Sequence, residues 1–436
     1  MNDSGELLRA PLFHTPRNPF RESGALESYT DGALILRDGR IAACGDYRTV
    51  SAAHPQVQVR DLRGGCLLPG LVDTHIHFPQ FRVLGGLGRT LLDWLEHCAL
   101  PEEARMADVP HACGIARRFV HTLAANGTTA ALVFGAHFAP ATAALFDAAA
   151  SAGLRVTAGM ALSDRFLLPE LHQTPESAYR DSTELIGRFH RRGRLRYAVT
   201  PRFALSTSAD MLAVCQTLLA EHDDLLVQTH LNENVAEIEQ VRRAFPWAAD
   251  YLAVYERFGL NRRRAVMAHD AHPTATELER LAASGATVAH CPSSNAALGS
   301  GLFPMNRHLA AGVHFALGTD VGAGAGFSLL KESLQAYLLQ RVAPGGILLD
   351  SAQLLYLATL AGAEALGLED QIGDFRPGKA ADFVYLRPAP DTPLAAILER
   401  EQSPEQTLAA ILTLAGAEMI REVRVEGSLV FERLST

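Results

Sequence analysis

The sequence predicts a (β/α)₈ TIM-like barrel with a small β-sandwich domain that the two chain ends build together. Short apolar runs alternate with alanine-rich segments of helical period through the middle of the chain, and strand-like segments occupy both ends. Polar side chains follow several of the apolar runs, as they do where barrel strands end. We therefore assign residues 1–70 and 371–436 to the sandwich domain and residues 71–370 to the barrel.

The sandwich domain is predicted from strand patterns at both ends of the chain. Residues 33–36 and 41–44 flank Asp38-Gly39, a dipeptide that favours a tight hairpin turn. Towards the other end, residues 381–386 have the pattern of a strand, and residues 423–431 that of a second hairpin around Glu426-Gly427. Two strand-rich ends around a different middle indicate one discontinuous β domain.

The barrel is predicted from eight apolar runs, each short enough for one buried strand. The segments between them, such as residues 211–221, 276–283 and 328–340, have helical period. Eight strand–helix units in about 250 residues favour a closed barrel. An open doubly wound sheet is the alternative, but no Gly-x-Gly-x-x-Gly or Walker-type loop follows the first run. The runs are residues 71–74, 130–134, 155–160, 197–200, 225–229, 265–268, 286–289 and 313–318.

The composition limits the classes of function. Of the 436 residues, 48% are hydrophobic and 20% are charged, which is typical of a globular protein. The formal net charge of −9 argues against a nucleic-acid or anionic-membrane partner, because either would need a basic surface. The six cysteines form no Cys-x-x-Cys pair, which favours a reducing compartment. The first residues, Met1 to Glu6, lack the apolar segment of a secretory signal, so we expect a cytoplasmic protein.

Polar side chains follow the predicted strands at one end. Because the carboxyl ends of barrel strands converge on one face, these side chains are expected to meet there. Imidazoles and a carboxylate that meet in this way form a metal site of nitrogen and oxygen ligands. Each residue alone could be a packed or capping side chain, and only their joint placement favours a site. They are His75, His77, Arg202, His230, His269 and Asp320.

Three motifs give the chain a resemblance to the amidohydrolase superfamily: Leu68-Pro-Gly-Leu-Val-Asp-Thr-His-Ile-His77, Gly318-Thr-Asp320 and Gly378-Lys-Ala-Ala-Asp-Phe383. Within it the chain is similar to the guanine deaminase family, from about residue 30 to its end. The resemblance implies a barrel with a terminal β-sandwich and metal-dependent hydrolysis of guanine to xanthine and ammonia. The stretches that carry it are residues 75–80, 91–96, 202–206, 230–233, 267–269, 289–295, 298–303 and 317–324.

The resemblance implies one metal ion rather than two. Many relatives hold two ions with a carboxylated lysine near the end of strand four, but residues 197–202 contain no lysine. The only lysines, Lys331 and Lys379, lie far beyond. Imidazole and carboxylate ligands suit Zn²⁺, with Fe²⁺ as the alternative. One ion is expected in each subunit of a homodimer. The implied ligands are His75, His77, His230 and Asp320.

The resemblance also implies catalytic roles. Asp320 is expected to take a proton from the attacking water and to pass it to the leaving amine, while His269 orients that water. Glu233 is expected to protonate a ring nitrogen of the substrate. The alternative for Glu233 is a solvated residue at the start of the helix over residues 234–243, where a carboxylate favours the helix dipole.

The resemblance also implies that the substrate is bound by Gln80, Arg202, Phe203 and His230. The guanidinium of Arg202 suits a carbonyl oxygen, and Phe203 can stack on a purine ring. The alternative is an ordinary surface arginine beside a core phenylalanine. Three further histidines are not expected to be ligands, because the site is already filled, but to be structural or to lie just behind the ligands: His137, His272 and His290.

Two other functions stay open at this point. A deaminase or dechlorinase of the same barrel could act on an adenosine-like, oxidised-guanine or triazine substrate, and it would differ at Gln80, Arg202 and Phe203. A barrel without catalysis could serve as a scaffold, but that alternative predicts lost ligands, and all four are present.

Overall fold

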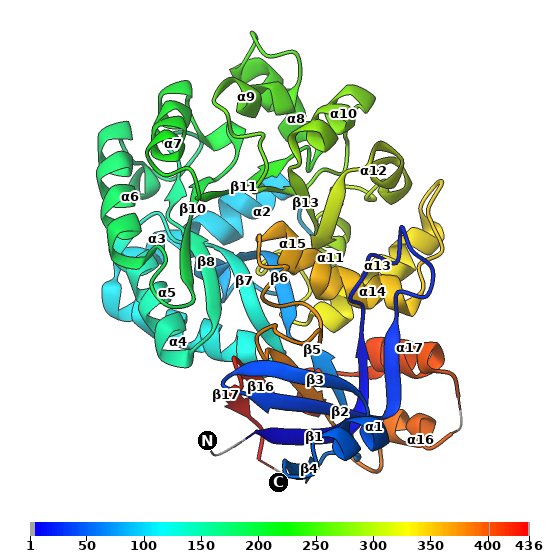
Figure 1. Ribbon diagram of the computed structural model, residues 1–436. Helices are drawn as coiled ribbons and strands as arrows, with labels where there is room; N and C mark the ends of the chain where they lie inside the picture. Colours follow the sequence, from blue (N-terminus) through cyan, green and yellow to red (C-terminus); the bar gives the residue numbers. More distant parts are fainter. Residues whose placement is uncertain (1–4, 401, 435–436) are drawn as a thin grey trace.

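The computed structural model describes residues 5–400 and 402–434, and its strands form two separate sheets (Figure 1). The middle of the chain forms a barrel, and strands from both ends form a second sheet beside it. Residues 1–4, 401, 435 and 436 belong to the predicted sandwich domain but lie outside the described residues, as do four of the six residues inspected for a secretory signal.

Eight parallel strands follow one another around the barrel in chain order. Backbone hydrogen bonds from Asp320 N to His75 O (2.9 Å) and from His77 N to Val321 O (2.8 Å) join the last strand segment to the first. All eight predicted apolar runs coincide with these strands, and the predicted fold class is confirmed. The strands are β6 (Leu71–His77), β7 (Thr128–Phe134), β8 (Arg155–Gly159), β10 (Leu195–Pro201), β11 (Leu226–Leu231), β12 (Ala265–His269), β13 (Thr287–His290) and β14 (His314–Leu317), with the short β9 (Ala161–Leu162) beside β10.

Helices surround the barrel between its strands (Figure 1). Polar caps fix where several of them begin: the side chain of Ser208 accepts a hydrogen bond from Met211 N, and Thr274 and Glu277 form a capping box. The helices are α4 (Val109–Ala125), α5 (Ala139–Ala152), α6 (Pro175–Phe189), α7 (Ala209–Glu221), α8 (Val235–Ala244), α9 (Tyr251–Arg257), α10 (Ala275–Ser284), α11 (Pro292–Ala297), α12 (Met305–Ala311), α13 (Leu329–Val342), α14 (Ser351–Ala358) and α15 (Leu360–Ala365).

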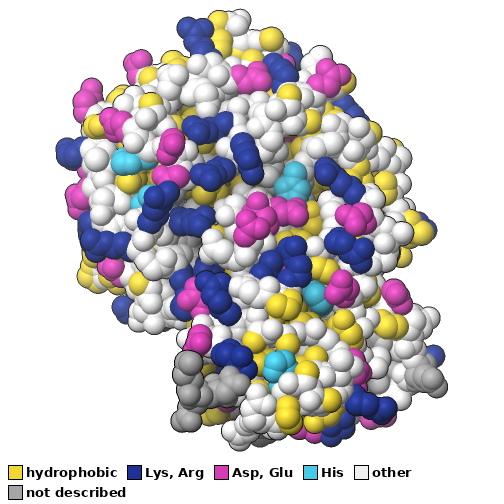
Figure 2. All heavy atoms as spheres, in the orientation of Figure 1, with side chains coloured by type: hydrophobic (Ala, Val, Ile, Leu, Met, Phe, Trp, Pro, Cys, Tyr) yellow, Lys and Arg dark blue, Asp and Glu magenta, His cyan; other side chains and the backbone are white. Residues whose placement is uncertain are grey.

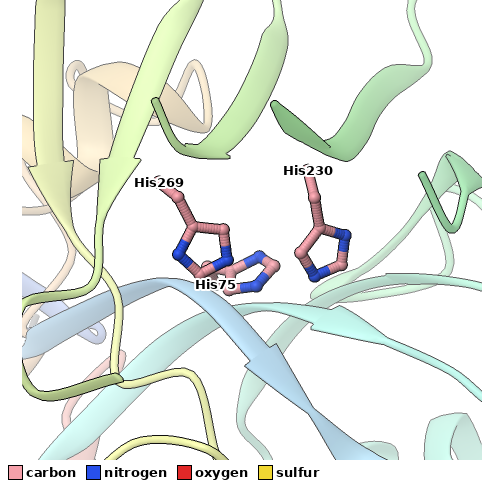
Figure 3. Close-up of side chains that lie close together, drawn as sticks. All are labelled: His75, His230 and His269. Atoms are coloured by element: carbon pink, nitrogen blue, oxygen red, sulfur yellow. The ribbon is translucent and has the colours of Figure 1, made fainter. Parts of the chain in front are cut away.

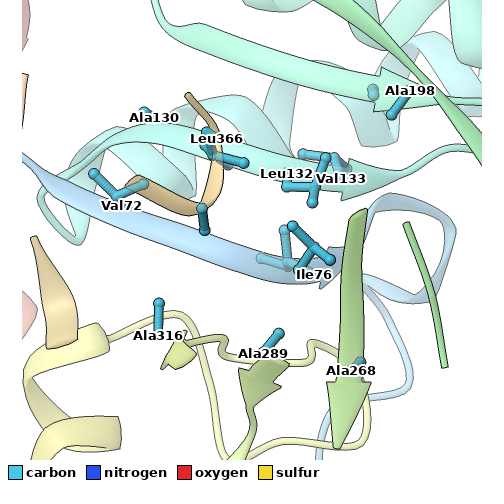
Figure 4. Packing of buried hydrophobic residues seen from close by; sticks show 14 of the residues in the cluster. Val72, Ile76, Ala130, Leu132, Val133, Ala198, Ala268, Ala289, Ala316 and Leu366 are labelled. Atoms are coloured by element: carbon cyan, nitrogen blue, oxygen red, sulfur yellow. The ribbon is translucent and has the colours of Figure 1, made fainter. Parts of the chain in front are cut away.

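The core lies between the barrel strands and between the strands and these helices. Figure 4 shows buried side chains of successive strands, including Ile76 of β6, Ala289 of β13 and Ala316 of β14. Several of the buried strand residues are alanines, whose small side chains let neighbouring elements approach closely. Within residues 5–400 and 402–434, no helix combines the length and apolar character needed to cross a membrane. On the outside, basic and acidic side chains are interspersed over the face shown in Figure 2.

The terminal sheet contains both predicted hairpins. Asp38 and Glu426 have φ values of 51° and 49°, and each is followed by a glycine of positive φ, as tight hairpin turns require. Strand β5 pairs antiparallel with β15 and so joins the two chain ends. The strands are β1 (Glu6–His14), β2 (Glu27–Arg37), β3 (Arg40–Asp46), β4 (Gln58–Asp61), β5 (Cys66–Pro69), β15 (Phe383–Leu386), β16 (Ile420–Val425) and β17 (Ser428–Glu432), with helices α1 (Tyr47–Ala53), α16 (Pro393–Leu398) and α17 (Pro404–Leu414).

Strand β1 is absent from the sequence prediction for a physical reason. Pro11 interrupts its apolar pattern, and proline is disfavoured inside a strand because it cannot donate to the ladder. In the structure, the pairing of β1 with β2 shifts register between Ala10 and Leu12, so Pro11 lies at a bulge. The domain boundaries near residues 70 and 371 stay a prediction.

A helical segment after β6 lines the mouth of the barrel. It begins with the 3₁₀ turn η1 (Phe78–Gln80) and continues, after a loop, through α2 (Leu91–Trp94), the π-helix η2 (Leu95–Ala99) and α3 (Leu100–Ala104). Its residues Gln80, Leu91, Trp94 and Leu95 line a pocket at the carboxyl ends of the barrel strands. This is the face on which barrel enzymes carry their active sites.

Candidate active site

Four side chains from three barrel strands meet at the mouth of the barrel. The Nε2 atom of His77 lies 3.2 Å from Nε2 of His75 and 3.3 Å from Nε2 of His230. The Oδ1 atom of Asp320 lies 3.3 Å from His75 Nε2 and 3.2 Å from His77 Nε2. All four side chains are buried. The structure thus brings the four predicted metal ligands together.

The charge state of these side chains fits a metal site. Burial lowers the pKa of His75 to about 4 and that of His230 well below its ordinary value, so both imidazoles are neutral at pH 7. Burial alone would raise the pKa of Asp320, but the neighbouring His75 and His77 lower it well below its ordinary value. The Nδ1–H of His230 donates to the carbonyl oxygen of Arg202 at 2.5 Å, which leaves its Nε2 lone pair facing the cluster.

The donor set therefore fits a cation such as Zn²⁺ or Fe²⁺. Neutral imidazole nitrogens and an ionised carboxylate oxygen are ligands that both ions accept. Figure 3 shows His75, His230 and His269 grouped together at this point. Two overlapping sets of three have their ligand atoms within 4.8 Å of one another: His75 with His77 and Asp320, and His75 with His230 and His269.

His269 is held so that one ring nitrogen faces the cluster. Its Nδ1 lies 2.9 Å from Oδ1 of Asn295, which can only accept, so Nδ1 carries the proton. The opposite atom, Nε2, is buried and has no hydrogen-bond partner among the described residues. It lies 3.4 Å from Oε2 of Glu233 and 3.9 Å from Oδ2 of Asp320. His269 can thus accept a hydrogen bond from a small molecule between these groups.

The backbone is strained where these residues lie. His269 and Asp320 have φ values of 76° and 48°, in the left-handed region that residues with a Cβ rarely adopt. A Cβ on Gly318 would lie 2.7 Å from Cβ of His75, so only glycine lets the two strands approach here. The hydroxyl of Ser294 donates to Oδ2 of Asp320 at 2.6 Å and fixes that carboxylate.

Glu233 lies on the wall of the same pocket. The hydroxyl of Ser300 donates to its Oε1 at 3.1 Å. Burial raises the pKa of Glu233 to about 8, and the charge of Asp320 adds to this effect. A buried carboxyl group with this pKa is protonated at pH 7 and can donate a proton.

The alternative role for Glu233, as the acid that stabilises the start of α8, belongs to another residue. Asn234 is the N-cap of α8, and Glu237 completes its capping box. Oε2 of Glu237 accepts hydrogen bonds from the backbone N–H groups of Glu233 and Asn234, each at 3.2 Å. Glu233 itself is only 3% exposed, so it is not a solvated side chain.

The predicted substrate-binding residues line one pocket with the cluster. Arg202 and Phe203 are 3% and 6% exposed, so the alternative of a surface arginine is wrong. The pocket is lined by His77, Gln80, Leu91, Trp94, Leu95, Arg202, Phe203, His230, Glu233, Leu298, Asp320 and Ala323.

Polar contacts fix Gln80 and Arg202. The amide nitrogen of Gln80 donates to Oε1 of Glu103 at 2.7 Å, and its amide oxygen accepts from Gly322 N at 3.1 Å. Arg202 Nη2 donates to the same Glu103 oxygen at 2.9 Å. Sequence reasoning missed Glu103, which lies outside every stretch that carried the resemblance. It also missed the roles of Ser294, Asn295 and Ser300, although the resemblance had pointed to their stretches.

The three histidines expected to be structural have partners away from the cluster. His137 Nε2 lies 3.3 Å from Ser163 Oγ, and His272 Nε2 lies 2.5 Å from the carbonyl oxygen of Ser300. The ring of His290 stacks on Phe303 with a centroid separation of 4.4 Å. These contacts agree with structural roles.

Comparisons with known proteins agree with this geometry. The model of the amidohydrolase family matches residues 66–430. The chain is 55% identical to a probable guanine deaminase of Deinococcus radiodurans over 98% of its own length and 99% of the relative's. Its structure is similar to that of the Escherichia coli guanine deaminase, with a TM-score of 0.93, 38% identity and coverage of 99% and 100% of the two chains. It is also similar to a Clostridium acetobutylicum guanine deaminase with guanine bound in the active site, with a TM-score of 0.89, 26% identity and coverage of 98% and 100%.

Proposed function

The chain belongs to the amidohydrolase family, and from this premise we propose that it is a guanine deaminase, which hydrolyses guanine to xanthine and ammonia. It is then a hydrolase of a C–N bond in a cyclic amidine. One observation carries the proposal. The cluster of His75, His77, His230 and Asp320 borders the same pocket as the buried Glu233 and the hydrogen-bonding side chains of Gln80 and Arg202.

The imidazole and carboxylate cluster would hold one metal ion, which we propose is Zn²⁺, with Fe²⁺ as the alternative. When bound, such an ion supplies Lewis acidity that makes a water molecule a nucleophile at neutral pH. A single ion is proposed because β10 carries no lysine that could bridge two. The proposed ligands are His75, His77, His230 and Asp320.

Asp320 and His269 would act on the attacking water, Asp320 by proton transfer and His269 by orienting it. Asp320 is ionised because its pKa is low, so it can accept a proton and later return it to the leaving amine. His269 presents an unprotonated Nε2 3.9 Å from Oδ2 of Asp320, and it can orient a water molecule between them. The Asn295 contact keeps His269 in this tautomer.

Glu233 and the remaining pocket residues would act on the purine. The protonated Glu233 can donate to a ring nitrogen while the carbon that bears the amine becomes tetrahedral. Arg202 and Gln80 offer N–H groups to the polar edge of the ring, and Phe203 offers an aromatic face.

The test is an ultraviolet assay for xanthine formation from guanine, with and without a chelator. We expect turnover by the purified protein, loss of turnover after chelation, and recovery when Zn²⁺ is added back. If metal-loaded protein is inert on guanine but active on an adenosine-like, oxidised-guanine or triazine substrate, the proposal that guanine is the substrate is wrong. Metal-loaded protein inert on all of them would favour the scaffold alternative.

Three finer points are part of the proposal. Elemental analysis should find one Zn²⁺ per subunit, and light scattering should find a homodimer. We propose a cytoplasmic location because all six cysteines are free, which suits a reducing compartment. Localisation of a tagged chain by fractionation tests it.

A further inference from the structure

Glu103 lies behind the candidate substrate pocket as a buried carboxylate with three polar neighbours. Its Oε1 accepts hydrogen bonds from Gln80 Nε2 at 2.7 Å and from Arg202 Nη2 at 2.9 Å. Its Oε2 lies 3.3 Å from Nδ1 of His137, whose opposite nitrogen lies 3.3 Å from Ser163 Oγ. Glu103 is buried and is not among the residues that line the pocket, so it reaches a substrate only through these neighbours.

The contacts of Gln80 fix the orientation of its side-chain amide, because only the amide nitrogen can donate to Glu103. The oxygen of this amide accepts from Gly322 N at 3.1 Å, and its nitrogen donates one hydrogen to Glu103. An amide nitrogen carries two hydrogens, so one remains for the pocket that Gln80 lines. Gln80 therefore has one N–H left to donate to the pocket, and its amide oxygen is already bonded to Gly322 N.

Arg202 likewise acts as a hydrogen-bond donor. A guanidinium has five N–H donors and no acceptor, and Glu103 takes one of them. The positive charge of Arg202 is compensated by Glu103, whose carboxylate stays ionised: burial would raise its pKa, but Arg202 and His137 lower it to about 2. Without this carboxylate, the guanidinium would be a buried charge without an ionised partner in this contact.

We propose that Glu103 is a positioning residue that orients Gln80 and Arg202 so that both donate hydrogen bonds to an acceptor atom of the purine. The proposal rests on the proposed function, since it assigns Gln80 and Arg202 to the substrate. A purine with a carbonyl oxygen at C6 can accept hydrogen bonds from the N–H groups of Gln80 and Arg202. A purine with an amino group at C6 would place its own N–H donors opposite those N–H groups. Glu103 would thus select 6-oxo over 6-amino purines without touching either.

The experiment compares guanine with 2,6-diaminopurine, which has the same 2-amino group but an amino group at C6. The KM and kcat for guanine and the inhibition constant of 2,6-diaminopurine are measured for the metal-loaded wild type, Glu103→Gln and Glu103→Ala. Glu102→Gln is the matched control, because Glu102 is the preceding residue of α3 and its carboxylate faces Arg82, Arg105 and His111 instead. Metal content and thermal unfolding show whether each variant is folded.

We expect the ratio of the 2,6-diaminopurine inhibition constant to the guanine KM to fall about tenfold or more in Glu103→Ala and less in Glu103→Gln, which keeps one oxygen. The KM for guanine should rise more than kcat falls, while metal content stays at the wild-type level. If Glu103→Ala does not fold, the test rests on Glu103→Gln. In that variant the ratio should fall at least threefold. A ratio within twofold of the wild type in the folded variants, or an equal change in Glu102→Gln, would overturn the proposal.

The two proposals fail in different ways. Absence of guanine turnover by the wild-type protein contradicts the proposed function. Normal turnover with an unchanged discrimination ratio contradicts only the role of Glu103. A double-substitution cycle adds a second readout: in a Gln80→Leu background, which lacks the amide, Glu103→Gln should change the ratio less than it does in the wild type.

Discussion

The side-chain amide of Asn232 donates a hydrogen bond to Oδ1 of Asp270 at 3.0 Å and joins the loop after β11 to the loop after β12. Both residues are buried and have positive φ values, 48° and 42°. Glu233 follows Asn232, and His269 precedes Asp270. Backbone hydrogen bonds from Asp270 N to Leu231 O (2.9 Å) and from Ala271 N to Asn232 O (3.1 Å) join the same two loops. Together these bonds fix two candidate catalytic side chains relative to each other.

Replacement of Asn232 should weaken both stability and catalysis. Asn232→Ala removes the side-chain bonds to Asp270 and Glu277, and alanine is strained at positive φ, so we expect a loss of about 2 kcal/mol in the free energy of unfolding. Asn232→Gly removes the same bonds without the strain and should lose less, because glycine adopts positive φ freely. Urea unfolding measures both losses, and kcat should fall in both variants. Equal stability of wild type and Asn232→Ala would show that these side-chain bonds contribute nothing.

The contact between Asn295 and His269 gives a second prediction. Asn295→Leu removes the acceptor that keeps the proton on Nδ1, so His269 can present an N–H to the cluster instead of a lone pair. We expect kcat to fall by about 10²-fold, as for loss of a general acid–base group. Elemental analysis should find unchanged metal content.

The variant His269→Ala separates the two roles that the geometry allows for this residue. If His269 only orients water, the variant keeps its metal and loses activity. If His269 is a ligand, as the set with His75 and His230 permits, the variant loses metal as well. We expect the first result.

Glu233→Gln tests the proton donor. Glutamine preserves the shape of the side chain but cannot give up a proton, so kcat should fall about 10²-fold or more while metal content stays intact. Glu239→Gln is a suitable control, because Glu239 is a partly exposed residue of α8 that pairs with Arg242 and Arg243. Near-normal turnover by Glu233→Gln would contradict the assigned role.

The barrel and the grouping of three imidazoles with a carboxylate could be predicted because their signals are local. Each barrel strand corresponds to an apolar run in the sequence. Within three residues after the end of such a run come His75, His77, His230 and Asp320. Barrel closure then brings these strand ends together whatever the intervening helices contain.

Glu103 could not be predicted in the same way. It lies in a helix between two strands, and only the fold brings it to Gln80 and Arg202, which are 23 and 99 positions away in the chain. Asp73 is a related case. It lies inside a recognised motif, but its acceptance of hydrogen bonds from the backbone and hydroxyl of Thr319, at 3.1 Å and 2.6 Å, depends on the closure of the barrel.

His14, in the terminal sheet, gives a prediction for stability against pH. Burial lowers its pKa to about 4, from an ordinary value near 6.5. The negative charge of Asp374 raises this pKa, and the positive charges of Arg376 and Lys379 lower it. The backbone N–H of Phe375 donates to its Nδ1 at 3.2 Å, which requires that this nitrogen carry no proton. The folded chain therefore holds His14 neutral at pH values at which the unfolded chain protonates it.

The sign of the effect follows from proton binding. Between pH 6.5 and pH 4 the unfolded state binds a proton at His14 that the folded state does not, so the free energy of unfolding falls as the pH is lowered through this range. The loss from this residue is at most about 3 kcal/mol. His14→Gln keeps an acceptor for Phe375 N but cannot be protonated, so its stability should depend less steeply on pH. Urea unfolding at pH 7 and pH 4.5 measures the difference, with His222→Gln, at a partly exposed histidine that ends α7, as the control. The same pH dependence in His14→Gln and the wild type would show that His14 is protonated equally in both states.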